Sequence, residues 1–287
     1  MRRLIIRPGA IGDVILSLPA LECLRAPYTE IWARSEVLPL LGWADRVCSI
    51  ASTGLDLVGL PGVEPPGPLW ERLRTFDSIV SWYGTGREQF RRAVAELPFV
   101  FFPPLPPANG RVHAADFFLA QARTLSDRRL EPIPRIRCPR LGGNYAVIHP
   151  FSGSVTKNWP LSRFRELAQW LETRMPVQWC AGPNENWTVQ EGSWGVASVR
   201  MENLYELAGW LAGARIYVGN DSGITHLAAA AGAPTVAIFG PTDPRVWGPR
   251  GPNVRIVATA RPGTPIEAVT VEQVLAAVDE ALASGCG

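Results

Sequence analysis

Apolar residues along this chain form short runs that alternate with segments of helical periodicity. RLIIR (3–7) ends at a Pro-Gly pair, and in the next segment, 13–25, apolar side chains recur every three or four residues. The same alternation predicts strands at 29–34, 46–52, 77–84 and 99–102 and helices at 35–44, 86–97 and 113–125. Short strands separated by helices are typical of βαβ units and therefore of a parallel sheet.

The alternation stops in a Pro- and Arg-rich stretch, 128–143, and then starts again. Three prolines forbid a regular helix there, so we place a domain boundary between residues 140 and 141. Further strands are predicted at 145–150, 176–182, 215–220, 234–240 and 254–259, and helices at 161–172, 204–214, 224–232 and 270–285. The last helix begins with the capping-box pair Thr270 and Gln273, and it packs either on its own domain or back on the N-terminal one. The pattern predicts two Rossmann-like α/β domains, 1–140 and 141–287.

The loops that follow the strands are the candidate sites, because ligands of open α/β sheets bind beyond the carboxyl ends of the strands. In the first loop, residues 8–13, two glycines allow a tight turn and close approach of a substrate. The loop matches neither the dinucleotide-binding nor the P-loop pattern. Asp13 has two interpretations: a first-turn acid that stabilises the helix, or a carboxylate that acts as a general base in a cleft.

A second loop, residues 152–160, combines small hydroxyl side chains, a glycine and a lysine before a helix opened by Pro160. Such a loop suits an anion such as a phosphate, and the alternative is an ordinary polar loop with a solvated lysine. Lys157 is the only lysine of the chain, in which arginine supplies every other basic side chain. That bias favours a specific role for Lys157.

A third loop, residues 219–226, also joins a predicted strand to a helix and carries an acid and a hydroxyl at the helix start. It could hold sugar hydroxyls and a pyrophosphate. The alternatives are N-capping by Asp221 and Ser222 and a packed helical role for His226. A fourth loop, 239–249, is dense in Gly and Pro, which predicts a rigid loop. Most of its residues are expected to keep the loop itself ordered.

Composition narrows the classes of function. Five scattered cysteines without a CxxC pair indicate reduced thiols, and three histidines argue against a zinc centre with several His ligands. No run approaches the length of a membrane span, and the N-terminal apolar stretch is too short for a signal peptide, so a cytoplasmic protein is expected. Residues 1–140 carry 18 Lys/Arg against 14 Asp/Glu, whereas 141–287 carry 10 against 12. The basic half favours an anionic saccharide or a membrane surface as a partner, or is simply a solvated face.

Three segments together resemble glycosyltransferase family nine, the ADP-heptose:lipopolysaccharide heptosyltransferases. They are LIIRPGAIGDVILSLPAL (4–21), IHPFSGSVTKNWPLSRFREL (148–167) and VGNDSGITHLAAAAGAPTVAIFGPTDPRVWGP (218–249). The third is long and specific, whereas residues 53–140 are less typical. The resemblance implies a GT-B fold, with two Rossmann-like domains whose parallel sheets face a central cleft. It also implies inverting transfer of a sugar, with heptose as the first expectation, from an ADP-sugar to a saccharide such as the lipopolysaccharide inner core.

The resemblance also implies roles for single residues. Asp13 is similar to the base that deprotonates the acceptor hydroxyl, and Gly12 beside it is expected to contact the donor. Lys157 is expected to neutralise the leaving diphosphate without a metal, and Glu185 to meet the nucleoside ribose. The remaining expected donor contacts are Ser152, Ser154, Met201 near the adenine, Asp221, Ser222, Gly223 and His226.

The same resemblance implies no metal or cofactor and no nucleic-acid partner. A nucleotide-sugar donor, a saccharide or glycolipid acceptor and peripheral contact with the cytoplasmic face of the inner membrane are expected. One departure is Phe151, which stands where the family has a glycine and could narrow the cleft or change the sugar accepted. Three alternatives remain open: a transferase of the same family with a different nucleotide sugar or acceptor, a GT-B-like sugar-nucleotide epimerase, and a non-catalytic sugar-nucleotide binder.

Overall fold

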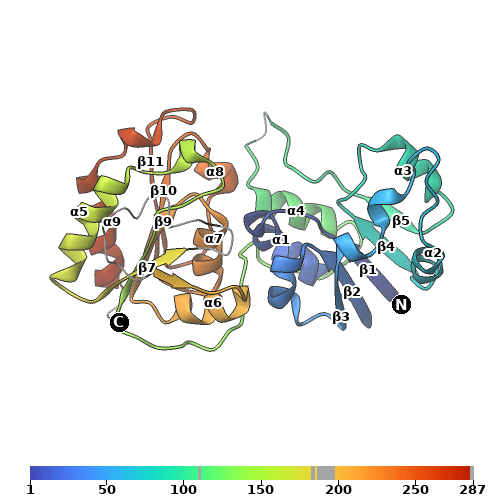
Figure 1. The fold of residues 1–287 in the computed structure, drawn as a ribbon, viewed down its shortest axis with the longest axis horizontal. Coiled ribbons are helices and arrows are strands. Elements are labelled where there is room, and N and C mark those ends of the chain that lie inside the picture. Colours follow the sequence, from blue (N-terminus) through green and yellow to red (C-terminus); the bar gives the residue numbers. More distant parts are fainter. Residues whose placement is uncertain (109–110, 182–184, 186–197, 285–287) are drawn as a thin grey trace. The chain divides into compact units, whose positions relative to one another are not determined.

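The computed structural model describes residues 1–108, 111–181, 185 and 198–284, and it divides into two compact α/β units, Met1–Pro132 and Ile133–Gly287. Each unit contains one parallel sheet with helices on both faces (Figure 1), which confirms the predicted fold class. The division falls inside the Pro- and Arg-rich stretch. No helix among the described residues has the length and apolar character needed to span a membrane.

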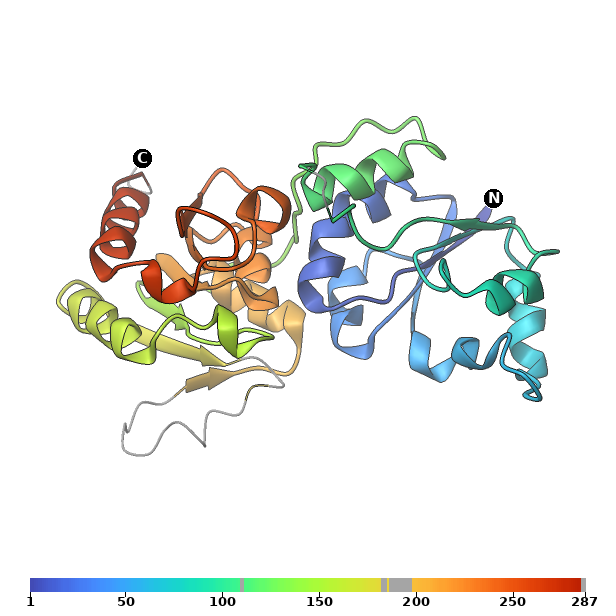
Figure 2. The same ribbon diagram turned by 90° about the horizontal axis from the view of Figure 1, so that it is seen from above.

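The first unit is built on a five-stranded sheet of order β3-β2-β1-β4-β5. Its strands are β1 (Arg2–Ile6), β2 (Tyr28–Ala33), β3 (Arg46–Ser49), β4 (Ser78–Ser81) and β5 (Phe99–Phe101). Alternate residues of β1 face opposite sides, as in any strand. Leu4 and Ile6 join the core under α2 (Gly67–Leu73) and α3 (Glu88–Ala93). On the other face α1 (Ile11–Cys23) and α4 (Ala114–Ala122) pack side by side, which Figure 2 shows as blue and green ribbons.

The second unit is built on a six-stranded sheet of order β11-β10-β9-β6-β7-β8. Its strands are β6 (Ala146–His149), β7 (Val177–Ala181), β8 (Ser198–Arg200), β9 (Ile216–Asn220), β10 (Thr235–Phe239) and β11 (Val254–Ala258). Helices α5 (Leu161–Glu172) and α9 (Val271–Ser284) cover one face, and α6 (Leu204–Ala212) and α7 (Gly223–Ala230) cover the other (Figure 1). The final helix α9 therefore packs on the sheet of its own unit, against β9, β10 and β11.

The predicted capping box at the start of α9 is present. The backbone N–H of Thr270 donates to Oε1 of Gln273 at 2.9 Å, and the N–H of Gln273 donates back to the Thr270 hydroxyl at 3.4 Å. The two bonds satisfy N–H groups that have no partner within the helix.

Several segments differ from the prediction. The helix expected at 35–44 is a 3-10 helix, Ser35–Leu41, because Pro39 inside it cannot donate the backbone bond of an α-helix. Helix α2 and strand β8 were not predicted. The loop expected to be rigid at 239–249 contains a one-turn helix, α8 (Pro244–Trp247), whose N-terminus is capped by Asp243.

In both sheets the strand order reverses beside the first strand of the unit. In the first unit the reversal lies between β1 and β4, and in the second it lies between β6 and β9. The loops that leave such a pair of strands diverge and open a crevice, which is where open α/β sheets bind ligands. The loops with the predicted chemistry follow β1, β6 and β9, so each of them borders one of the two reversals.

The segment that precedes β6 is held against helix α6 by two glycines on one face of that helix. Leu141 N–H donates to the carbonyl of Gly209 at 3.1 Å. A Cβ at Gly209 would lie 2.8 Å from the carbonyl oxygen of Pro139, and one at Gly213 would lie 2.2 Å from that of Leu141. The backbone therefore approaches the helix more closely than any side chain would allow.

We expect Gly213→Ala to lower the free energy of unfolding by about 1–3 kcal/mol, because the new methyl group must displace the Leu141 backbone. The matched control is Gly142→Ala on the other side of the same contact, where an added Cβ meets nothing within 4 Å. That control is expected to change stability by less than about 1 kcal/mol. Urea unfolding followed by far-UV circular dichroism measures both, and equal effects would contradict the close approach.

Candidate functional site

The loop after β6 is fixed at both ends by polar contacts, of which the one at its end is buried. At its start, Ser152 Oγ lies 2.7 Å from the carbonyl oxygen of Ser154 and 2.7 Å from Oδ1 of Asn158, which closes the loop on itself. At its end, the indole N–H of the buried Trp159 donates to the carbonyl of Val269 at 2.8 Å. The half-buried Lys157 is carried on the short 3-10 turn between them.

The buried side chain of Asn220, at the end of β9, joins this loop to the next strand. Its Nδ2 donates to the carbonyl of Pro150 at 2.8 Å, and its Oδ1 accepts from the backbone N–H of Trp159 at 3.1 Å. Both groups of the amide are satisfied, as a fully buried polar side chain requires. The loops after β6 and β9 are thereby held in a fixed relation.

The loop after β9 is the N-terminus of α7. Ser222 is the N-cap, and its Oγ accepts from the backbone N–H of Thr225 at 3.2 Å. The predicted capping role of Ser222 is therefore present. Capping satisfies one donor of the first turn, and the other N–H groups of that turn, with the positive end of the helix dipole, favour an anion there. Gly223, the first residue of the helix, leaves the approach unobstructed by a side chain.

An ion pair brings together the two loops beside the reversal. Lys157 Nζ lies 3.1 Å from Oδ2 of Asp221, and the side chains are 26% and 8% exposed. The ammonium group has three donors, so it can keep this partner and still donate to a further acceptor. Asp221, which follows β9, therefore holds the only lysine of the chain at the carboxyl-terminal edge of the sheet.

Of the other residues predicted for the donor, Glu185 joins this group through His149, and the backbone N–H of His226 donates to the carbonyl of Ser222 at 3.2 Å. Glu185 Oε2 lies 2.7 Å from Nε2 of His149, the last residue of β6. Met201 is half-buried directly after β8, and His226 is buried within α7. The predicted motif around Glu185 extends over residues 182–184, which lie outside the described part of the chain.

His149 itself is a residue that the sequence analysis missed. It is fully buried, and its Nδ1 lies 3.3 Å from the hydroxyl of Ser222 while Nε2 contacts Glu185. The signal was a histidine at the end of an otherwise apolar strand. Its partners come from distant segments: Ser222 follows β9 and Glu185 follows β7, and both strands pair with β6.

In the first unit, Asp13 occupies the first turn of α1 and closes that turn. Its Oδ2 accepts from the backbone N–H of Ala10 at 3.1 Å, so the capping interpretation is present geometrically. A Cβ at Gly9 would lie 3.0 Å from the Cβ of Asp13, which explains a glycine in this turn. Asp13 and the neighbouring Gly12 are half-buried, so the carboxylate keeps access to solvent.

Behind Asp13 lies a buried guanidinium group. Arg7 is 1% exposed and donates to the backbone carbonyl of Asp13 at 3.2 Å and to the hydroxyl of Ser17 at 3.2 Å, with Phe118 stacked 4.4 Å from its Cζ. Burial lowers the pKa of Arg7 to about 10, and the carboxylate of Asp13 opposes that shift. The guanidinium group of Arg7 therefore holds the backbone of the first turn of α1 in place.

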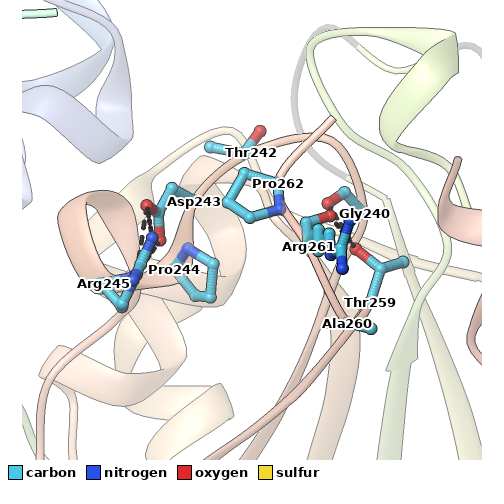
Figure 3. Close-up of a pocket in the computed structure, with 9 residues that line it drawn as sticks. All are labelled: Gly240, Thr242, Asp243, Pro244, Arg245, Thr259, Ala260, Arg261 and Pro262. Carbon is cyan, nitrogen blue, oxygen red and sulfur yellow. Dashed lines mark hydrogen bonds and ion pairs between the residues drawn. The ribbon is translucent and has the colours of Figure 1, made fainter. Parts of the chain in front are cut away.

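The fourth loop lines a pocket of about 380 Å³ beyond the ends of β10 and β11 (Figure 3). Asp243 is bonded to both the backbone and the guanidinium of Arg245, and these bonds, chiefly that from the side chain, lower the pKa of Asp243. Thr242, Thr259 and Arg261 contribute further polar groups. None of the residues predicted for the donor lines this pocket. Among the described residues no group of three or more His, Cys, Asp or Glu side chains is arranged to hold a metal.

Comparisons with known proteins give one family. The model of glycosyltransferase family 9 (heptosyltransferase) matches residues 105–273. Lipopolysaccharide heptosyltransferase 1 of Escherichia coli (strain RS218) is 33% identical over 148 residues, which cover 50% of this chain. The matched part covers 44% of that protein, so the alignment spans less than half the length of this curated relative.

Two solved structures share the fold over nearly the whole chain. A glycosyl transferase family 9 protein from Veillonella parvula superposes with a TM-score of 0.77 at 18% identity, covering 99% of this chain and 97% of that one. An E. coli heptosyltransferase solved with ADP-2-deoxy-2-fluoro heptose superposes with a TM-score of 0.66 at 22% identity, covering 98% and 99%.

Phe151 packs inside the second unit at the start of the loop after β6. It is 9% exposed, and its ring meets that of His149 edge to face, with centroids 6.0 Å apart. We expect Phe151→Ala to lower the free energy of unfolding by about 3 kcal/mol, the usual cost of emptying a buried aromatic site. In the same loop, Val155→Ala at an 82% exposed position should change it by no more than about 0.5 kcal/mol. Urea unfolding compares the two variants, and a small effect at Phe151 would show that its ring is not a packing group.

Proposed function

Because this chain belongs to glycosyltransferase family 9 (heptosyltransferase), we propose that it is an inverting glycosyltransferase. The proposed donor is an ADP-linked sugar, with heptose as the sugar, and the proposed acceptor is a saccharide such as the lipopolysaccharide inner core. The observation that carries the proposal is the ion pair of Lys157 with Asp221, which joins the two anion-suited loops beside the reversal of the second sheet.

The proposed donor site uses groups that are fixed before a ligand arrives. The diphosphate lies against the N-terminus of α7, capped by Ser222, and against the Lys157 ammonium group, with the small loop of Ser152 and Ser154 beside them. Glu185 accepts from the ribose hydroxyls. Two loops of this kind provide several N–H and O–H donors and an ammonium group that can donate to a phosphate oxygen while it keeps its bond to Asp221.

The proposed reaction is a direct displacement at the anomeric carbon of the donor. Negative charge develops on the departing diphosphate, so a cation and N–H groups already aimed at it stabilise the transition state more than the ground state. Lys157 and the α7 N-terminus supply that stabilisation in our proposal, which assigns no step to a metal. Asp13, anchored through its carbonyl by Arg7, takes the proton of the acceptor hydroxyl.

The acceptor is proposed to contact the first unit. Asp13 lies there, and residues 1–140 carry the basic excess that suits an anionic saccharide. The same charge supports peripheral contact with the cytoplasmic face of the inner membrane as part of the proposal.

The proposed base is tested with Asp13→Asn. Asparagine keeps an oxygen for the N–H of Ala10, so the turn is retained while the proton acceptor is lost. We expect kcat to fall by about 10²–10⁴-fold, the usual contribution of a general base. Because the Asp13 carboxylate is proposed to contact the acceptor and not the nucleotide, the Kd for ADP should stay unchanged. Transfer is followed by mass spectrometry of the acceptor with ADP-heptose as donor.

Glu88→Gln is the matched control, since Glu88 is also a first-turn acid in the first unit and its exposed carboxylate pairs with Arg92. This variant should keep wild-type turnover. Wild-type turnover by a folded Asp13→Asn protein would remove Asp13 from the proposed mechanism.

The proposed nucleotide is tested by thermal unfolding with ADP-, UDP- and GDP-linked sugars. A ligand that binds only the folded state at 100 times its Kd stabilises by about 2.7 kcal/mol, which shifts Tm by about 5–10 °C for a unit of this size. We expect ADP-heptose to give the largest shift and Lys157→Ala to reduce it. A larger shift with a UDP- or GDP-sugar would contradict the proposed donor.

A further inference from the structure

His149 connects two groups that the proposed function assigns to different parts of the donor. Its Nε2 lies 2.7 Å from Oε2 of Glu185, the proposed ribose ligand, and its Nδ1 lies 3.3 Å from Oγ of Ser222, in the proposed diphosphate loop. The ring is fully buried at the end of β6, opposite Gly219 of β9 in the sheet. Its place is therefore fixed by the strand pairing.

Two aromatic rings restrict the orientation of the imidazole. The ring of Tyr217 lies nearly parallel to it, with an interplanar angle of 24° and centroids 6.4 Å apart, and Phe151 meets it edge to face. A ring held in this way keeps both nitrogens aimed at the same partners. The carboxylate of Glu185 is 21% exposed, so it remains within reach of a ligand while one of its oxygens is held.

The carboxylate partner assigns one proton of this network. A carboxylate only accepts, so Nε2 of His149 carries a hydrogen and donates it to Glu185. Nδ1 lies within hydrogen-bond distance of the Ser222 hydroxyl, which accepts from the backbone N–H of Thr225 and also lies 3.1 Å from Oγ1 of Thr225.

The far side of the network is closed by Tyr217. Burial raises the pKa of Tyr217 well above its usual value, so its phenol stays protonated and donates to Oγ1 of Thr225 at 3.0 Å. The hydroxyl of Thr225 in turn donates a hydrogen bond to the carbonyl of Asn220. The network is thus satisfied without solvent on this side, and its exposed end is Glu185.

We propose that His149 is a positioning residue that presents the Glu185 carboxylate to the ribose hydroxyls of the nucleotide. Because the imidazole holds Oε2, the carboxylate is oriented before the ligand arrives, and the side chain loses less rotational freedom on binding. This inference rests on the proposed function, in which Glu185 is the ribose ligand. It adds that the ribose preference is set by a residue that does not touch the ribose.

The test compares two variants that keep different halves of the imidazole. Asparagine at position 149 reaches only as far as Nδ1, so His149→Asn keeps the contact with Ser222 and loses the one with Glu185. Glutamine is long enough to place an amide N–H at the position of Nε2, so His149→Gln keeps the contact with Glu185. Tyr217→Phe is the matched control, because it removes a buried hydroxyl of the same network at the end away from Glu185.

The measured quantity is the ratio of the Kd for 2′,3′-dideoxy-ADP to the Kd for ADP, obtained by isothermal titration calorimetry. We expect a ratio of about tenfold or more for the wild type, which corresponds to a hydrogen bond to a charged group. The ratio should fall to near one in His149→Asn and stay near the wild-type value in His149→Gln and Tyr217→Phe. If His149→Asn does not fold, His149→Phe, which keeps a ring and removes both nitrogens, takes its place with the same expectation.

The outcomes separate this inference from the proposed function. A folded His149→Asn protein that keeps the wild-type ratio contradicts the positioning role alone. A wild-type protein that binds ADP without preferring it to the dideoxy form contradicts the ribose contact. A wild-type protein that does not bind ADP contradicts the proposed nucleotide and the inference with it.

Discussion

The buried amide of Asn220 is the contact on which the candidate site depends. The carboxyl ends of β6 and β9 lie side by side, and their loops leave in diverging directions, so nothing in the sheet itself fixes one loop relative to the other. Asn220 donates to the carbonyl before one loop and accepts from the N–H at its end. Burying an amide with an unpaired N–H or carbonyl group costs free energy, so both hydrogen bonds of Asn220 are retained. Together they fix the positions of the two loops relative to each other. Two further contacts also join β6 and its loop to the loop after β9. They are the ion pair of Lys157 with Asp221 and the contact of His149 with Ser222.

In both units a buried polar side chain holds the backbone of a candidate loop in place. In the first unit the guanidinium of Arg7 bonds to the carbonyl of Asp13, and in the second the amide of Asn220 bonds to the carbonyl of Pro150. In each unit a buried polar group at the end of a strand fixes the backbone of a candidate loop, and that loop carries the candidate functional side chains. The ordering of these loops is achieved during folding, so a ligand meets groups that are already in place.

The elements that the sequence predicted well are those whose signal is local. Helix α5 has the predicted bounds, 161–172, because its apolar residues recur regularly and Pro160 marks its start. The 3-10 helix at Ser35–Leu41 was predicted as an α-helix because its apolar pattern outweighed Pro39. Strand β8 is Ser-Val-Arg and has no apolar run, whereas the equally short β5 is Phe-Val-Phe and was predicted. The candidate loops were found from their small and polar residues, but the contact of Lys157 with Asp221 and the role of His149 depend on strand order, which no local pattern contains.

The single lysine has a consequence for chemistry outside catalysis. Arginine supplies every other basic side chain, so the chain has one ε-amino group, and that group is partly exposed and held by Asp221. Amine-directed reagents such as acylating labels or aldehydes therefore have only this side chain and the terminal amine as targets. If the proposed donor binds beside Lys157, the extent of modification at this side chain reports on its occupancy without any engineered probe.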